Sequence, residues 1–276
     1  MQTRRLVDPA HYERMTSEEL RAAFLVEDLF SSGELHLVHW EAERTVLGGA
    51  VPRESALALE APPEIKAEFF AERREIGIVN LGASGTVLVD DARHVLAPRD
   101  GLYVGRGSRE IAFASDRPDA PARFYLVSHP AHATLPIRHV TARAAETVRI
   151  GSPQNASARI LRRYIHARGI GSCQLVMGVT DMEPGCVWNT MPPHTHARRT
   201  EIYLYFDLEP EAFALHVMGP PDETRHIVVR NLQAVLSPSW SMHFAAATSR
   251  YAFVWSMGGE NQEFEDMQAV SMDQLR

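Results

Sequence analysis

The feature that most constrains the fold of this chain is a long succession of short β-forming runs. From about Leu35 onward, apolar and β-branched stretches such as 76–81, 85–91 and 102–104 are separated by Gly, Pro and Asp. Many short strands at close spacing favour a sandwich or a closed barrel. The chain has 276 residues, of which 45% are hydrophobic, so it can form one large β domain or two small ones. We therefore predict an all-β protein with minor helix.

The minor helix is expected near the N-terminus. Residues 17–25 carry apolar side chains at helical spacing and acidic residues early in the segment. Ser17 is the candidate N-cap, because a serine hydroxyl can accept a hydrogen bond from a free backbone N–H of the first turn.

A possible metal site lies in the C-terminal half. His194 and His196 are two residues apart, so on an extended strand both side chains project from one face. Glu201 lies an odd number of residues further on and reaches that face only if residues 197–199 form a turn or bulge; this charged triplet is a plausible hairpin tip. His243 follows a turn that begins at Pro238. Three imidazoles and one carboxylate suit a divalent ion of intermediate hardness, so we predict that these four residues bind one metal ion.

An internal repeat relates the two halves of the chain. Residues 73–81 resemble 198–208, and residues 94–110 resemble 226–243. In this alignment Glu110 takes the place of His243, while Glu68 and Phe70 take the places of His194 and His196. The alternative is that two β-rich halves resemble each other in composition alone. We expect an N-terminal domain without a metal site over 1–140 and a metal-binding domain over 141–276, joined by the Ala-, Thr-, Ser- and Pro-rich stretch 136–157.

Composition argues against several classes of protein. A formal net charge of −7 disfavours a nucleic-acid-binding protein, which needs a concentrated basic face. The two cysteines, Cys173 and Cys186, are too few for a disulfide framework and are expected to be core thiols in a reducing compartment. The sequence has neither an apolar leader nor an apolar run long enough to cross a membrane, so a cytoplasmic protein is expected.

The spacing of the predicted ligands resembles the metal site of cupins: His-x-His, four residues, Glu, and a distant His after a Pro-containing turn. Cupins usually carry a glycine at the position of Trp240. The resemblance implies a bicupin, with two β-sandwich or jelly-roll barrels in one chain. Longer strings resemble those of the 5-keto-4-deoxyuronate isomerase family, in which this tryptophan is part of the pattern. These strings cover 24–27, 72–75, 102–105, 188–192, 223–228, 237–241 and 259–262.

The family resemblance implies a cytoplasmic, hexameric enzyme with one zinc ion per chain on His194, His196, Glu201 and His243. Its substrate would be the open-chain keto-uronate 4-deoxy-L-threo-5-hexosulose uronate, which the family converts to 3-deoxy-D-glycero-2,5-hexodiulosonate in pectin and uronate breakdown. Such an aldose–ketose isomerisation moves a proton between adjacent carbons through an enediol. A bound divalent ion can stabilise the negative charge that develops on the oxygens.

The sequence leaves the other active-site roles open. Glu201, Tyr203, which shares the strand face of Glu201, and His226 are candidates for the catalytic base. The substrate carboxylate calls for a guanidinium, and Arg163, Arg199 and Arg225 are candidates, with Trp188 as a possible pocket wall. Two other classes remain as alternatives: a cupin that only binds a sugar acid, and an iron dioxygenase with the same four ligands.

Overall fold

The protein is described from a computed structural model, which covers residues 1–260 and 266–276 and divides the chain into two compact units. The first unit comprises Met1–Arg4, Asp28–Glu146 and Tyr164–Val176. The second comprises Arg5–Glu27, Thr147–Arg163 and Met177–Arg276. Two segments thus cross the expected domain boundary at residue 140. Asn261 and Gln262, the end of the last family string, lie outside the described residues. No helix among the described residues is long and apolar enough to span a membrane.

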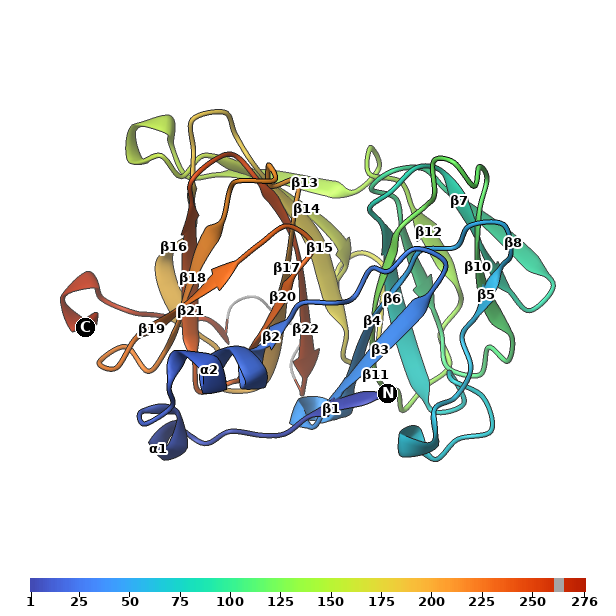
Figure 1. Cartoon of the computed structure of the whole chain (residues 1–276), viewed down its shortest axis with the longest axis horizontal. Helices are drawn as coiled ribbons and strands as arrows, with labels where there is room; N and C mark the ends of the chain where they lie inside the picture. Colours follow the sequence, from blue (N-terminus) through green and yellow to red (C-terminus); the bar gives the residue numbers. More distant parts are fainter. Residues whose placement is uncertain (261–265) are drawn as a thin grey trace. The chain divides into compact units, whose positions relative to one another are not determined.

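The first unit consists of two sheets. In sheet order, the larger contains β1 (Gln2–Arg4), β3 (Leu35–Trp40), β4 (Thr45–Ala50), β11 (Phe124–Pro130), β6 (Arg74–Asn80), β9 (Gly101–Val104) and β12 (Arg138–Val140). The smaller contains β5 (Leu57–Ala58), β10 (Ile111–Ser115), β7 (Gly85–Val89) and β8 (Ala92–Leu96). The strands are labelled in Figure 1.

The core of the first unit lies between these two sheets. On β6 the alternating side chains of Ile76 and Ile78 enter it, together with Val87 from β7, Phe113 from β10 and Leu126 from β11. All five are fully buried. This alternation is the period of two that a strand imposes when one of its faces is buried in a core.

The second unit repeats this arrangement. Its larger sheet contains β13 (Glu146–Ile150), β14 (Arg159–Ile165), β15 (Val176–Met182), β22 (Ala252–Gly259), β17 (Arg199–Phe206), β20 (Ala234–Ser237) and β2 (Leu25–Val26). The smaller contains β19 (Arg225–Val229), β18 (Ala214–Gly219), β21 (Met242–Ala247), β16 (Trp188–Thr195) and β23 (Gln268–Ala269). The two units therefore share one strand order, which supports the predicted repeat.

The N-terminal segment of the second unit supplies the expected helix. It contains α1 (Pro9–Tyr12) and α2 (Ser17–Phe24), and β2 then adds to the sheet edge at β20. In Figure 1, α2 is drawn in blue and contacts β19. The N-cap is Thr16 and not Ser17: the Thr16 hydroxyl accepts the Glu19 N–H, and the Glu19 carboxylate accepts the Thr16 N–H. The reciprocal bonds of this capping box favour Thr16, one residue before the predicted cap.

The connection between β16 and β17 is not a hairpin, which corrects one detail of the sequence prediction. The two strands belong to different sheets, with β16 paired to β21 and β17 paired to β22. The turn at residues 196–198 carries the chain from one sheet to the other. His194 and Glu201 consequently reach the same interior from opposite walls, which removes the difficulty posed by strict strand alternation.

Candidate metal centre and active site

The four predicted ligands form one cluster inside the second unit. His194 lies on β16, His196 in the turn that follows it, Glu201 on β17 and His243 on β21. One possible ligand atom from each side chain lies within 4.8 Å of those of the other three. Glu201 Oε2 is 2.9 Å from His196 Nε2 and 3.0 Å from His243 Nε2. Bonds of about 2 Å from nitrogen and oxygen to a divalent ion require ligand atoms at this scale of separation.

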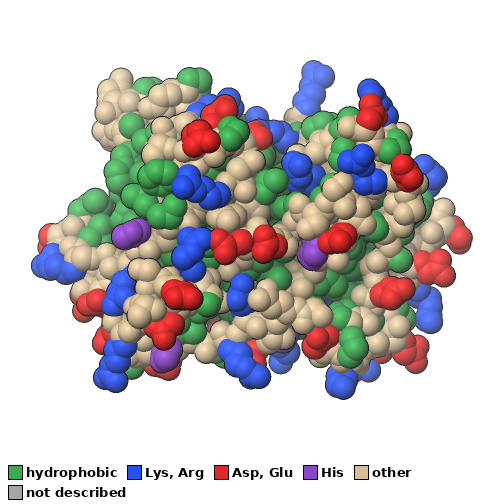
Figure 2. Space-filling view, in the orientation of Figure 1, with side chains coloured by type: hydrophobic (Ala, Val, Ile, Leu, Met, Phe, Trp, Pro, Cys, Tyr) green, Lys and Arg blue, Asp and Glu red, His purple; other side chains and the backbone are tan. Residues whose placement is uncertain are grey.

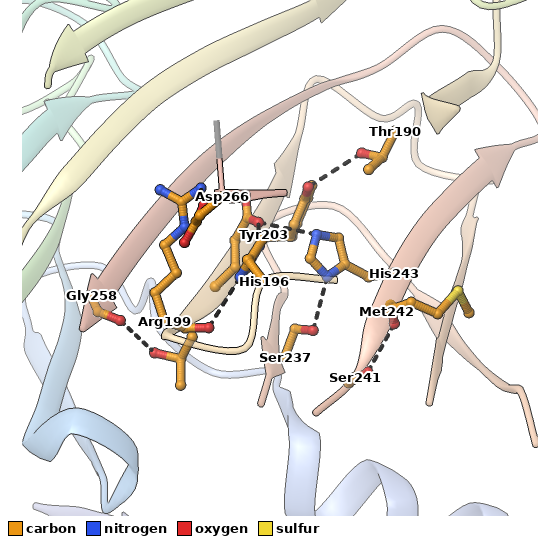
Figure 3. A network of polar contacts seen from close by, with 12 residues as sticks. Thr190, His196, Arg199, Tyr203, Ser237, Ser241, Met242, His243, Gly258 and Asp266 are labelled. Atoms are coloured by element: carbon orange, nitrogen blue, oxygen red, sulfur yellow. Dashed lines mark hydrogen bonds and ion pairs between the residues drawn. The ribbon is translucent and has the colours of Figure 1, made fainter. Parts of the chain in front are cut away.

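Hydrogen bonds orient two of the imidazoles toward the centre of the cluster. Nδ1 of His196 is 3.0 Å from the Arg199 carbonyl oxygen, and Nδ1 of His243 is 3.0 Å from the Ser237 hydroxyl (Figure 3). A carbonyl only accepts, so His196 carries a proton on Nδ1, and its Nε2, which points inward at Glu201, is the nitrogen that can bind a metal ion. Such outer hydrogen bonds fix the tautomer of a metal-binding histidine. The residues present therefore fit a divalent metal ion.

The charges in the cluster also suit metal binding. Burial favours the neutral form of the Glu201 carboxyl, but His243 and His196 outweigh burial and hold its pKa well below the usual range. Burial, assisted by His243, lowers the pKa of His194 to about 3. His196 differs, because its hydrogen bond to Glu201 overcomes burial and raises its pKa. The cluster thus offers an ionised carboxylate and a neutral imidazole at His194, which are the protonation states that bind metal.

A cavity of about 420 Å³ opens beside the cluster. His194 and Glu201 form part of its wall, whereas His196 and His243 are almost fully buried behind that wall. The β16 ladder is irregular between Asn189 and His194, and the intervening residues line the cavity. The wall is mostly apolar, with the aromatic side chains of Tyr203, Phe253 and Trp255 among its members. This volume suits a small organic ligand.

Two further sequence candidates line this cavity. Tyr203 is fully enclosed, and its hydroxyl lies 3.2 Å from the Thr190 hydroxyl (Figure 3). Burial and the nearby Glu201 raise the pKa of Tyr203 well above its usual value. Arg163, on β14, also lines the cavity from the larger sheet, which carries Tyr203 as well.

The other candidates lie elsewhere in the second unit. His226 is exposed on β19, and Trp188 is 37% exposed beside Phe244 on the smaller sheet. The guanidinium of Arg225 donates to the carbonyls of Met15 and Glu13, anchoring the N-terminal segment. None of these three residues lines the cavity.

Arg199 is buried but has a different role from the predicted one. Its guanidinium pairs with Asp266 at 2.6 Å, and its carbonyl accepts from His196. It does not line the cavity. The charged side chain therefore ties the segment that leads into β23 to β17, which is a structural task.

The sequence interpretation missed three residues of the site. Arg159 and Thr180 line the cavity from β14 and β15, and His216 is buried with its ring 6.3 Å from that of His243. Strand alternation offered a signal for Arg159, because residues 159, 161 and 163 share a face. His216 had no sequence signal, since its place beside the cluster depends on the pairing of β18 with β21.

The same positions in the first unit are aliphatic. Strands β17 and β20 of the second unit correspond to β6 and β9 of the first. Glu201 pairs with Ser237 in the former ladder and Ile76 pairs with Val104 in the latter, so Ile76 occupies the position of Glu201. Likewise, His243 pairs with Met218 between β21 and β18, and Ile111 pairs with Val89 between the equivalent strands β10 and β7. Ile111 therefore occupies the position of His243.

The equivalence extends to the first histidine. In the second unit His194 pairs with His243. In the first unit the Leu59 N–H donates to the carbonyl of Ile111, the residue equivalent to His243, so Leu59 occupies the position of His194. Leu59, Ile76 and Ile111 thus replace His194, Glu201 and His243, which corrects the alignment that put Glu68 and Glu110 there; both glutamates are exposed. The metal cluster found among the described residues is the one in the second unit.

A family model described as the KduI/IolB family matches residues 24–272. The chain belongs to the KduI/IolB family. Family members include proteins named 4-deoxy-L-threo-5-hexosulose-uronate ketol-isomerase. One from Caldicellulosiruptor bescii is 46% identical to this chain, and one from Shouchella clausii is 48% identical. Both alignments extend over 276 residues and cover 100% of each chain. The family predicted from the sequence strings is confirmed.

Solved structures show the same fold. An IolB-like protein from Salmonella typhimurium matches with a TM-score of 0.73 at 14% identity, covering 90% of this chain and 96% of that one. An oxalate decarboxylase variant from Bacillus subtilis matches with a TM-score of 0.61 at 11% identity, covering 90% and 79%. The predicted all-β, two-barrel cupin architecture is confirmed.

Proposed function

We propose that this protein is a ketol-isomerase that converts 4-deoxy-L-threo-5-hexosulose uronate to 3-deoxy-D-glycero-2,5-hexodiulosonate during uronate breakdown. The observation that carries the proposal is the position of the ligand cluster in the wall of a cavity, in a chain aligned end to end with relatives of that name. The substrate is an α-hydroxy aldehyde and the product is an α-hydroxy ketone. The reaction therefore needs a proton carrier between two adjacent carbons and a device that stabilises enediolate charge.

His194, His196, Glu201 and His243 would hold one zinc ion per chain, and three imidazoles with one carboxylate suit zinc. When bound, the ion supplies Lewis-acid stabilisation of negative charge on the substrate oxygens. The buried aromatic wall excludes water, so that polar groups act in a medium of low dielectric constant.

Two side chains of the cavity wall are assigned to proton transfer. Glu201 is the carboxylate in the wall, and once freed from the metal ion it would take the carbon-bound proton and return it to the neighbouring carbon. Tyr203 remains a protonated phenol. Its hydroxyl donates to Thr190, whose own proton goes to Asn189, and with substrate bound it would donate to a substrate oxygen instead. Exposed His226 has no part in this mechanism. Tyr203→Phe should lower kcat by about 10²-fold while metal content stays the same.

The proposal extends to the setting of the enzyme. A cytoplasmic location agrees with the two free cysteines, Cys173 and Cys186. Acidic and basic side chains are interspersed on the face drawn in Figure 2, which suits a small-molecule enzyme better than a nucleic-acid-binding protein. A homo-hexamer is proposed by family resemblance, and light scattering tests it: a monomer at working concentration would contradict it.

One assay tests the proposed reaction. The purified protein is incubated with the unsaturated monouronate that polysaccharide lyases release, and the ketose product is followed by chromatography and mass spectrometry. Product formation with no oxygen uptake is expected. Oxygen consumption would indicate a dioxygenase, and tight binding without turnover would indicate a sugar-acid-binding protein.

A further inference from the structure

The cavity wall formed by the larger sheet contains a buried cation without a counter-ion, on a strand separated from that of Glu201 by β15 and β22. Arg159 lies on β14 and is 7% exposed. Its guanidinium donates to the Ser157 carbonyl at 2.9 Å. Over residues 1–260 and 266–276, no carboxylate lies within ion-pair distance of it. A buried guanidinium is costly unless a negative group compensates its charge.

The groups nearest to Arg159 do not supply that charge. Tyr203 and Tyr251 act on it electrostatically, but both are phenols, which are neutral near pH 7. The neighbouring Arg162 is different, because it pairs with Asp181 and does not line the cavity. Two arginines three residues apart on one strand therefore face different surroundings: Arg162 has a protein carboxylate, whereas Arg159 faces the cavity without one.

A second polar group without a partner lies in the same wall. Thr180, on the neighbouring strand β15, is 0% exposed, and its hydroxyl makes no hydrogen bond. Buried hydroxyls are nearly always hydrogen-bonded, so an unpaired one in a cavity wall is a candidate ligand contact. Arg163 lines the wall as well and adds positive charge to it. The wall thus combines a guanidinium, a hydroxyl and a second arginine.

We propose that Arg159 and Thr180 bind the carboxylate of an open-chain sugar acid, whose other end lies beside His194 and Glu201. This assignment rests on the proposed function for the identity of the sugar acid. A guanidinium offers two parallel N–H donors that match a carboxylate, and the threonine hydroxyl can donate to the same group. The pair fixes which end of the substrate reaches Glu201, and it selects acids over neutral sugars. Arg163 contributes charge at the rim of this subsite.

The test uses two ligands that cannot isomerise: the borohydride-reduced keto-uronate and its carboxamide. They have similar shape, but only the first carries a negative charge. Binding of each to the metal-loaded protein is measured by calorimetry for wild type, Arg159→Gln, Thr180→Val and the matched control Arg162→Gln. Metal content and circular dichroism confirm that each variant is folded.

Wild type should bind the acid about 10- to 100-fold more tightly than the carboxamide, the range of a charge-assisted hydrogen-bonded pair. Arg159→Gln should remove this preference and leave carboxamide affinity within about threefold of wild type. Thr180→Val should weaken acid binding by about threefold to tenfold, and Arg162→Gln should retain the full preference. If Arg159→Gln fails to fold, Thr180→Val carries the test together with Arg159→Lys, which keeps the charge but loses the two parallel donors and should bind the acid more weakly than wild type.

Equal binding of acid and carboxamide by wild type would overturn the assignment, as would an equal loss of both ligands in Arg159→Gln. The outcome is separate from that of the proposed reaction. A protein that prefers the acid through Arg159 but forms no ketose from the keto-uronate would keep the subsite and lose the isomerase function. A protein that isomerises the keto-uronate with no such preference would keep the function and lose the subsite.

Discussion

The interiors of the two units differ in chemistry although their strand orders match. At equivalent ladder positions the second unit has His194, Glu201 and His243, and the first has Leu59, Ile76 and Ile111. The first interior is packed with aliphatic and phenylalanine side chains, while the second leaves a cavity of about 420 Å³. A duplicated β-barrel can thus use one copy for packing and the other for chemistry, because side chains at the same positions decide which interior closes.

A second contrast concerns one glutamate. Glu75 adjoins Ile76 on β6, but its carboxylate is on the face away from the core. It accepts the Tyr103 hydroxyl at 2.8 Å and the backbone N–H groups of Cys173, Gln174 and Leu175. Glu75 and Glu201 both lie in the two segments that resemble each other in sequence, 73–81 and 198–208. The strand faces show that Glu75 holds a loop within the first unit, whereas Glu201 belongs to the ligand cluster.

The largest expected effect is the loss of metal binding and turnover when His243 of the second unit is replaced. His243→Ala should abolish stoichiometric metal binding and lower turnover by about 10³-fold or more, because enediolate charge then lacks its stabiliser. Metal analysis and the isomerase assay measure this, and His36, which is half-buried on β3 of the first unit, provides the control His36→Ala. Folded, metal-free His243→Ala protein that isomerises at the wild-type rate would contradict the comparison.

The equivalent change in the first unit should act on stability instead. Ile111→Ala removes buried methyl groups from a packed core and should lower the free energy of unfolding by about 2–5 kcal/mol. Denaturant titration measures the loss, while metal content and kcat of the folded protein should stay at wild-type values. A loss of bound metal in this variant would show that the first interior contributes to the site.

The buried histidines sharpen the comparison through pH. In the first unit, burial lowers the pKa of His129 to about 3. An unfolded histidine takes up a proton below about pH 6.5, whereas folded His129 does not until about pH 3, so folding stability falls across that interval. His129→Gln should remove about 1–3 kcal/mol of this acid destabilisation at pH 4.5. Calorimetric Tm values at pH 7 and pH 4.5 test it; an unchanged Tm difference would mean that His129 is not buried as a neutral ring.

The smallest effect concerns the helix that belongs to the second unit. Thr16→Ala should lower the free energy of unfolding by about 0.5–2 kcal/mol, because the Glu19 N–H loses its acceptor. Ser17→Ala is the matched control and should change stability by less than about 0.5 kcal/mol. Equal losses in the two variants, measured by thermal unfolding, would argue against the capping box.

Much of the fold and of the metal site could be predicted from sequence because the signals are local. Short β runs with a period of two predicted an all-β fold, and the spacing of His194, His196, Glu201 and His243 predicted one cluster. Strand geometry converts such spacing directly into side-chain direction. The carboxylate subsite was less accessible, since Arg163 was a candidate and Arg159 was not.

What the sequence determined by itself was composition, strand periodicity, family and the identity of the four clustered side chains. Only the tertiary structure decided which wall each residue occupies. It moved Arg199, Arg225 and His226 out of the proposed site, and it replaced Glu68 and Glu110 by Leu59 and Ile111 in the repeat. The physical reason is that burial and counter-ions depend on which strands pair across the sheets. Two arginines three residues apart, Arg159 and Arg162, look alike in the sequence and differ only once a folded neighbour neutralises one of them.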